Sequence, residues 1–304
     1  MTGQEPTVRI EAPAKINLGL EILGRRQDGY HEIRSILAMI DLTDTLTISP
    51  IPSNDLTSQI VGMDIEPDDN LIVKASHLLG QSLHVEIDKH IPMAAGLGGA
   101  SSDAAATLFA GNALQAHSLS TKELLTLAGR IGSDVPFFLG SPCAMVSATG
   151  TDLTPLPAPS GWIVLATPAL TIPQKTATLY ANLRPADFSD GSSIATQADR
   201  LRTSQELDTA LLRNAFSRAL DDSFPELQQL KHSMRDAGCP FVALSGAGPT
   251  HYTIVKTKQA ADRIAANLHL PLSSGARVMI AKIRQTGLSI EKVGASEASM
   301  DPLA

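Results

Sequence analysis

A glycine-rich segment that runs into alanines is the part of this chain best suited to bind a phosphate group. It spans residues 92–106, and Gly96, Gly98 and Gly99 allow positive φ angles and a close approach of the backbone to a ligand. The two serines after the glycines favour the start of a helix, and the alanines favour its continuation. The loop amides and the helix N-terminus would then point at one place, which favours an anion.

This segment differs from the two best-known nucleotide-binding loops. No Gly-Lys-Ser/Thr follows the glycines, so it is not a Walker A loop, and a dinucleotide-binding fingerprint starting at Gly96 would need a glycine at Ser101. A lone Gly-x-Gly-Gly favours an ordinary turn before a core helix, but the length and character of this segment favour a phosphate cradle. The residues expected to contact the phosphates are Pro92, Met93, Ala94, Ala95, Gly96, Leu97, Gly98, Gly99, Ala100, Ser101 and Ser102.

Two charged residues elsewhere in the chain are suited to phosphoryl transfer, which needs charge stabilisation and a group that accepts the proton of the attacking hydroxyl. Lys15 and Asn17 alternate with Ile16 and Leu18, so in a strand they would share the polar face. Asp134 follows a predicted helix and is the candidate base, although aspartates are also common in ordinary turns at helix ends. A lysine beside this aspartate would keep it ionised and stabilise the transferring phosphoryl group.

The strands and helices that must position these groups mix irregularly along the chain. We expect two strands within 8–23, strands within 33–48 with a turn near residues 41–44, and strands at 83–87, 161–166, 241–244, 252–255 and 276–283. We expect helices at 70–79, at 102–117 and after Ser120, which is spaced for a capping box with Glu123, and a loop at 184–200. Because the order is not a regular βαβα alternation, the predicted fold class is α+β.

Composition and bulk charge limit the possible function classes. A length of 304 residues and a hydrophobic content of 43% suit a globular protein, and the net charge of -7 argues against general nucleic-acid binding. The N-terminus lacks a signal-peptide pattern, no apolar run is long enough to span a membrane, and Cys143 and Cys239 have no metal-ligand spacing. We therefore expect a cytoplasmic protein, a monomer or homodimer, with no nucleic-acid or membrane partner.

Proline-rich residues 155–159 mark the predicted domain boundary. They divide the chain into residues 1–157 and 158–288, and residues 289–304 are expected to form a disordered tail.

Three separated segments resemble the signature motifs of the GHMP kinases, in the same order and with similar spacing. They are residues 12–18, 92–106 and 244–250. The resemblance implies an N-terminal domain like domain 2 of ribosomal protein S5, a ferredoxin-like C-terminal domain, and an active site between them. It also implies that the glycine loop holds the phosphates of ATP and that Lys15 and Asp134 are the catalytic pair. Mg²⁺ is expected to neutralise the phosphate charge, with Ser101 or Ser102 nearby and its ligands left open.

Residues 29–33 and 132–138 resemble one branch of this family, whose substrate is a methylerythritol linked to cytidine diphosphate. The resemblance implies ATP-dependent phosphorylation of the 2-hydroxyl of that substrate, in the isoprenoid-precursor route that does not use mevalonate. Tyr30 is suited to stack on cytosine, and His31 is suited to hydrogen-bond its edge. The candidate substrate-binding residues are Asn17, Tyr30, His31, Lys89, Tyr180, Gly246 and Gly248.

Two alternatives and two departures from the family pattern accompany this hypothesis. The chain could be a GHMP kinase for another alcohol, such as homoserine or mevalonate, or a nucleotide-binding module without catalysis. The Gly-Tyr-His segment argues against the first, and the presence of both Lys15 and Asp134 argues against the second.

Ala94 and Ala95 stand where glycines are frequent in the family, so we expect negative φ angles there. Asn214 is assigned no role.

Overall fold

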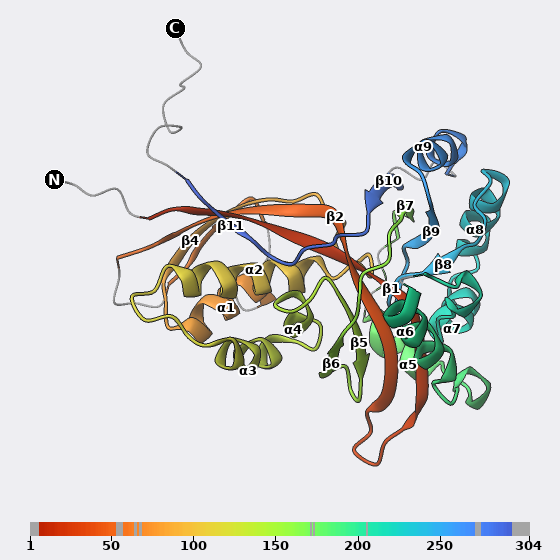
Figure 1. Cartoon of the computed structure of the whole chain (residues 1–304), viewed down its shortest axis with the longest axis horizontal. Coiled ribbons are helices and arrows are strands. Elements are labelled where there is room, and N and C mark those ends of the chain that lie inside the picture. Colours follow the sequence, from red (N-terminus) through yellow and green to blue (C-terminus); the bar gives the residue numbers. More distant parts are fainter. Residues whose placement is uncertain are drawn as a thin grey trace, which may run out of the picture.

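β1 and β2 are long neighbouring strands at the centre of the larger of two sheets (Figure 1). The computed structural model describes residues 6–52, 57–63, 66, 69–170, 172, 174–204, 206–270 and 275–293. The larger sheet has the order β11-β1-β2-β4-β3, and β5 joins it at β2 and pairs with β6. Its strands are β1 (Val8–Arg25), β2 (His31–Pro50), β3 (Gln59–Val61), β4 (Leu83–Asp88), β5 (Cys143–Ser147), β6 (Asp152–Pro155) and β11 (Ile290–Lys292).

Helices from the N-terminal half of the chain cover one face of this sheet (Figure 1). They are α1 (Leu71–Leu79), α2 (Gly99–Ala113), α3 (Thr121–Ile131) and α4 (Val135–Phe138). The predicted capping box at the start of α3 is confirmed, because Ser120 accepts a hydrogen bond from the amide of Glu123 and the Glu123 carboxylate accepts one from the amide of Ser120. α2 lies against the sheet and extends directly from the glycine loop.

The smaller sheet has the order β10-β7-β9-β8 and lies with the remaining helices at the other end of the molecule (Figure 1). Its strands are β7 (Trp162–Thr167), β8 (Ala243–Leu244), β9 (His251–Val255) and β10 (Arg277–Lys282). The helices here are α5 (Lys175–Ala181), α6 (Ser192–Ser204), α7 (Phe216–Ser223), α8 (Leu227–Asp236) and α9 (Lys258–Asn267), with single 3₁₀ turns η2 (Pro185–Asp187) and η3 (Thr209–Leu211). Within the described ranges, none of the helices could cross a membrane.

One hydrophobic core joins the two sheets. Ile16 and Leu18 of β1 share it with Leu165 of β7 and Tyr252 of β9. Because side chains alternate along a strand, this packing directs Lys15 and Asn17 of β1 to the opposite face, where the glycine loop lies over Lys15.

The α+β class is confirmed, and four local predictions are wrong. β2 continues through the turn expected near residues 41–44, where Thr43 and Asp44 pair with β1. Residues 8–25 form one strand rather than two, because a register shift after Pro13 lets β1 pass a residue that has no amide proton to donate. α6 occupies part of the expected loop at 184–200, since Ile194, Ala198 and Leu201 form a buried helical stripe.

The predicted tail also begins too early. Residues 290–292 form β11, which pairs with β1 through Val8↔Lys292 and Ile10↔Ile290. Backbone pairing with an edge strand orders this segment, whereas residues 294–304 lie outside the described residues. The domain division after residue 157 stays a prediction.

Candidate active site

The glycine loop lies directly over Lys15 of β1. The amide of Lys15 donates a 2.8 Å hydrogen bond to the carbonyl of Leu97. Gly98 has a φ of 74°, and a Cβ added there would lie 3.0 Å from both Cγ of Lys15 and Cζ of Phe138. A glycine is therefore required at this position both for the backbone conformation and for the close approach to β1.

A chain of hydrogen bonds holds the head group of Lys15. Nζ of this buried lysine lies 3.6 Å from Oδ2 of Asp134 and donates a 2.8 Å hydrogen bond to Oδ1 of Asn17. Nδ2 of Asn17 donates to Oγ of Ser35 at 2.8 Å, and that hydroxyl donates to the carbonyl of Gly19 at 2.6 Å. Because each partner is itself held, the ammonium group has a defined position.

Asp134 is available to a ligand, although it stands at the start of a helix. Its side chain makes no capping hydrogen bond to α4. It is 41% exposed, whereas the side chain of Lys15 is 6% exposed. The carboxylate therefore faces solvent while the lysine contacts it from within, and the structure brings these two predicted residues together.

The backbone of the glycine loop departs from our expectation at one residue. Gly96 has a φ of 82°, but Ala94 also has a positive φ, of 52°, so the predicted negative angle is wrong there. The carbonyl of Ala94 accepts a 2.6 Å hydrogen bond from Nζ of Lys175, a residue that was not among those predicted for the site. This contact stabilises a conformation that an alanine seldom adopts.

The segment around residues 244–250 closes over the glycine loop. Oγ of Ser245 donates a 2.9 Å hydrogen bond to the carbonyl of Gly96. Nδ2 of Asn214 donates to the carbonyls of Leu244 and Gly246 at 3.0 and 2.8 Å. Asn214, to which we assigned no role, therefore fixes the third motif, and no local pattern in the sequence signals this contact.

Each glycine of the third motif lies next to a lysine of the site, Gly246 next to Lys15 and Gly248 next to Lys175. Gly246 has a φ of 56°, and a Cβ there would lie 3.2 Å from Nζ of Lys15 and 3.4 Å from Oδ1 of Asn17. Gly248 has a φ of 71°, and its carbonyl accepts a second hydrogen bond from Lys175. Asn17 is buried with both side-chain groups engaged, so it positions Lys15 in this structure, and its contact with substrate stays a prediction.

An aromatic pocket of about 690 Å³ is lined by Tyr30, His31 and Tyr180 among others. The rings of His31 and Tyr180 stack with centroids 4.6 Å apart and planes 21° apart, and Tyr30 is exposed at the rim. Burial lowers the pKa of His31, so its imidazole is neutral at pH 7 and both donates and accepts. Burial, and then the nearby charge of Asp134, raises the pKa of Tyr180.

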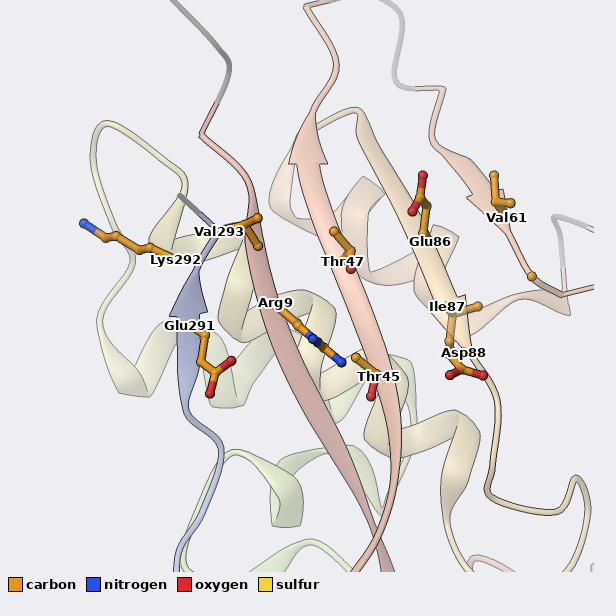
Figure 2. Close-up of a pocket in the computed structure, with 11 residues that line it drawn as sticks. Arg9, Thr45, Thr47, Val61, Glu86, Ile87, Asp88, Glu291, Lys292 and Val293 are labelled. Carbon is orange, nitrogen blue, oxygen red and sulfur yellow. The ribbon is translucent and has the colours of Figure 1, made fainter. Parts of the chain in front are cut away.

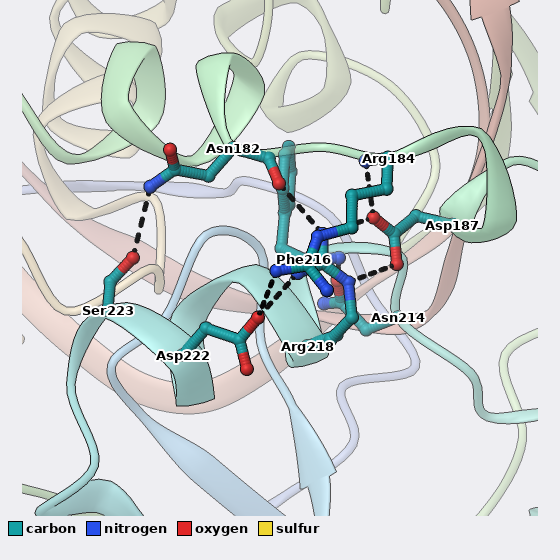
Figure 3. Close-up of polar contacts among 8 residues, drawn as sticks. All are labelled: Asn182, Arg184, Asp187, Asn214, Phe216, Arg218, Asp222 and Ser223. Carbon is teal, nitrogen blue, oxygen red and sulfur yellow. Dashed lines mark hydrogen bonds and ion pairs between the residues drawn. The ribbon is translucent and has the colours of Figure 1, made fainter.

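A polar cluster centred on Arg218 holds the segment that follows α5 (Figure 3). The guanidinium group donates to Oδ1 of Asp187 at 2.8 Å and to the carbonyl of Asn182 at 2.7 Å. Its hydrogen bonds lower the pKa of Asp187, so this carboxyl stays ionised. The cluster fixes the end of α5 against α7, where the ring of Tyr180 meets that of Phe216 edge-on at 4.9 Å.

Lys89 lies in a buried ion cluster rather than in the aromatic pocket. Its Nζ donates to Oδ2 of Asp44 at 2.5 Å and to Oδ2 of Asp103 at 2.7 Å. Burial alone would lower the pKa of Lys89, but the two carboxylates outweigh burial and raise it. The cluster ties β2 and the segment after β4 to the start of α2, so Lys89 positions the glycine loop, and a contact with substrate stays a prediction.

A second hollow, of about 650 Å³, lies on the other face of the larger sheet (Figure 2). Its lining includes Arg9, Thr45 and Glu86. These side chains alternate with residues such as Ile10 and Leu46, which are buried among the residues that pack beneath the sheet. The sheet therefore separates this hollow from the glycine loop, and it is not part of the candidate site.

Comparisons with known proteins agree with this geometry. Residues 70–141 match the family described as the GHMP kinases N terminal domain, and residues 195–272 match the one described as GHMP kinases C terminal. A protein of Dehalococcoides mccartyi named 4-diphosphocytidyl-2-C-methyl-D-erythritol kinase is 40% identical over 268 residues, which are 84% of this chain and 92% of that protein. The chain belongs to the GHMP kinases. A relative of the same name from Symbiobacterium thermophilum is 35% identical over 90% of this GHMP kinase and 99% of its own length.

Solved structures of GHMP kinases share the fold. A crystal structure of 4-(cytidine 5'-diphospho)-2C-methyl-D-erythritol kinase has a TM-score of 0.75 at 32% identity and covers 90% of this chain and 98% of its own. Homoserine kinase from Cytophaga hutchinsonii has a TM-score of 0.74 at 17% identity over 96% and 99% of the two chains, which is a likeness of fold alone. The two-domain GHMP kinase fold is thus confirmed, and as a member of this family the protein uses ATP.

Proposed function

We propose that this GHMP kinase transfers the γ-phosphoryl group of ATP to the 2-hydroxyl of 4-diphosphocytidyl-2-C-methyl-D-erythritol, giving ADP and the 2-phosphate. One observation carries the proposal at this site. The Lys15–Asp134 contact of 3.6 Å lies beside the glycine loop, and the charge of Asp134 acts on Tyr180, which lines the aromatic pocket. The names of relatives 35 to 40% identical over most of the chain support the choice of substrate.

Asp134 is proposed to accept the proton of the attacking hydroxyl. Its exposed carboxylate can be reached by an alcohol bound in the pocket, and the ammonium group of Lys15 contacts it from within the protein. The same ammonium group would stabilise the alkoxide that develops as the proton leaves. Asn17 holds this ammonium group in place, so the cation does not need to reorganise during the reaction.

The amides of the glycine loop are proposed to hold the ATP phosphates at the start of α2. Mg²⁺ usually binds to substrate phosphates and one or two protein oxygens, keeping several waters. The site fits such an ion, because the hydroxyl of Ser102 is a buried oxygen without a hydrogen-bond partner in the described structure. Within the described ranges, no group of three or more His, Cys, Asp and Glu side chains is placed to hold a metal by itself. When bound with ATP, Mg²⁺ would neutralise phosphate charge.

The aromatic pocket is proposed to bind the cytosine base. Tyr30 offers an exposed ring for stacking, and the neutral imidazole of His31 can both donate to and accept from the edge of a pyrimidine. The electrostatic effect of Asp134 on Tyr180 supports a pocket that opens next to the reacting groups. A substrate with its base here would extend its alcohol toward Asp134.

Turnover of the purified protein tests the proposal. ATP, Mg²⁺ and 4-diphosphocytidyl-2-C-methyl-D-erythritol are expected to give ADP and a product one phosphate heavier, while homoserine, mevalonate and galactose give none. Turnover of one of those alcohols instead would keep the Lys15–Asp134 chemistry and discard the cytosine pocket. ATP binding without turnover of any alcohol would indicate a nucleotide-binding module.

A further inference from the structure

Lys175 places a positive charge where the two glycine motifs meet. It is the first residue of α5, and its Nζ donates hydrogen bonds to the carbonyls of Ala94 in the glycine loop, at 2.6 Å, and of Gly248 in the third motif. It forms no ion pair with any residue that the structure describes. A half-buried ammonium group without a carboxylate partner is uncommon and is costly to maintain.

The surroundings of Lys175 disfavour its charged form. Burial, and then the charge of Lys15, lowers the pKa of Lys175 to about 8. Lys15 and Lys175 therefore lie close enough for their charges to interact. Among the residues that the structure describes, Asp134 is the one carboxylate at ion-pair distance from either lysine, and its partner is Lys15. An anion that entered this region would relieve both the desolvation and the repulsion.

The backbone on both sides of the contact is strained. Ala94 has a φ of 52° and Gln174, immediately before the lysine, has a φ of 46°. Non-glycine residues in this conformation persist where the surrounding structure requires them, and they cluster at ligand-binding sites. An ammonium group also has three protons to donate, and two are used by the carbonyls, so one remains for a ligand.

We propose that Lys175 is a phosphate-binding residue of the transfer site, whose ammonium group contacts a phosphate oxygen of one of the two nucleotides in the cleft. The proposal rests on the proposed function. Contact with Ala94 places the ammonium group beside the loop for ATP. The same helix carries Tyr180 five residues later, about 7.5 Å along the helix axis, so the diphosphate of a cytidine substrate is the other source of the phosphate.

Nucleotide binding to Lys175→Met tests the proposal and separates the two sources. ATP, ADP, AMP, CDP and CMP would be titrated calorimetrically with Mg²⁺ into the wild type, Lys175→Met, Lys175→Arg and the control Lys122→Met, which changes an exposed lysine of α3. If the phosphate belongs to the adenine nucleotide, Lys175→Met should weaken the binding of ATP or ADP at least tenfold and leave AMP unchanged. If it belongs to the cytidine substrate, the variant should weaken CDP at least tenfold and leave CMP unchanged. Lys175→Arg, which keeps the charge, should retain most of the affinity.

The pattern of affinity losses across the five nucleotides distinguishes a phosphate contact from a purely structural role, in which Lys175 only holds the two glycine motifs together. A loss confined to ATP places the lysine on the γ-phosphate, a loss shared by ATP and ADP places it on the β-phosphate, and a loss confined to CDP places it on the acceptor diphosphate. Unchanged binding of all five nucleotides, or equal weakening that includes AMP and CMP, would overturn the proposal. A wild type that binds no nucleotide would instead overturn the proposed function itself, and this inference with it.

Discussion

Nζ of Lys15 lies 3.6 Å from Oδ2 of Asp134, and the two groups differ sharply in exposure. The lysine is buried and held by Asn17, whereas the aspartate is open to solvent and caps no helix. This asymmetry suits a fixed cation and a carboxylate that exchanges a proton with a bound alcohol. The relationship depends on Gly98, since any side chain there would meet the lysine stem.

Gly98→Val should strongly weaken ATP binding. Valine at a φ of 74° is strained, and its Cβ would lie 3.0 Å from Lys15 and Phe138, so the loop must move away from β1. We expect ATP affinity to fall by more than about tenfold, or 1.4 kcal/mol, in a calorimetric titration. Gly129→Ala is the matched control, because nothing lies within 4 Å of its added Cβ. Equal ATP affinity in the two variants would show that the loop does not hold the phosphates.

Tyr180→Ala should weaken the cytidyl substrate and spare ATP. Stacking of a base on an aromatic ring contributes about 1–3 kcal/mol, so the KM for the acceptor should rise about 5- to 160-fold. Tyr180→Phe keeps the ring that stacks on His31 and should stay near the wild type. Steady-state kinetics with each substrate varied would check this. A similar rise in the KM for ATP would place the cytosine elsewhere.

Lys89→Met should lower the free energy of unfolding of the protein. It would leave Asp44 and Asp103 buried without their cation, and removal of one partner of a buried ion pair costs about 3–5 kcal/mol. Urea denaturation would measure the loss. Lys122→Met, on the exposed face of α3, should change the unfolding free energy by less than about 0.5 kcal/mol. Comparable unfolding in both variants would mean that the cluster does not support the fold.

The same cluster predicts a pH dependence of stability. Burial, together with the charge of Asp44 and against that of Lys89, raises the pKa of Asp103 to about 7. Between about pH 4 and pH 7 the folded state keeps a proton that the unfolded chain has released, so this residue's contribution to stability decreases as pH rises. Asp103→Asn cannot release that proton. Its unfolding free energy relative to the wild type should therefore increase from pH 5 to pH 8, and a constant difference would contradict the assignment.

The residues of the candidate site were easier to predict from sequence than the residues that hold them in place. Gly98 and the serines after it predict a phosphate loop, because local backbone geometry restricts which residues can form one. Asn214 and Lys175 act through backbone carbonyls of residues far away in the chain, and such partners are set by tertiary packing alone. α6 was missed because its apolar stripe is narrow and most of its residues are polar.

The central claim is that Asp134 is the base of a kinase, and single-turnover kinetics of Asp134→Asn test it most directly. The amide keeps the size of the side chain but cannot accept the proton, so we expect the single-turnover rate constant to fall about 10²- to 10⁴-fold. ATP affinity, measured on the same samples, should stay unchanged because the glycine loop is untouched. Asp152→Asn, at an exposed strand position, is the matched control. Turnover of Asp134→Asn within tenfold of the wild type would contradict the account.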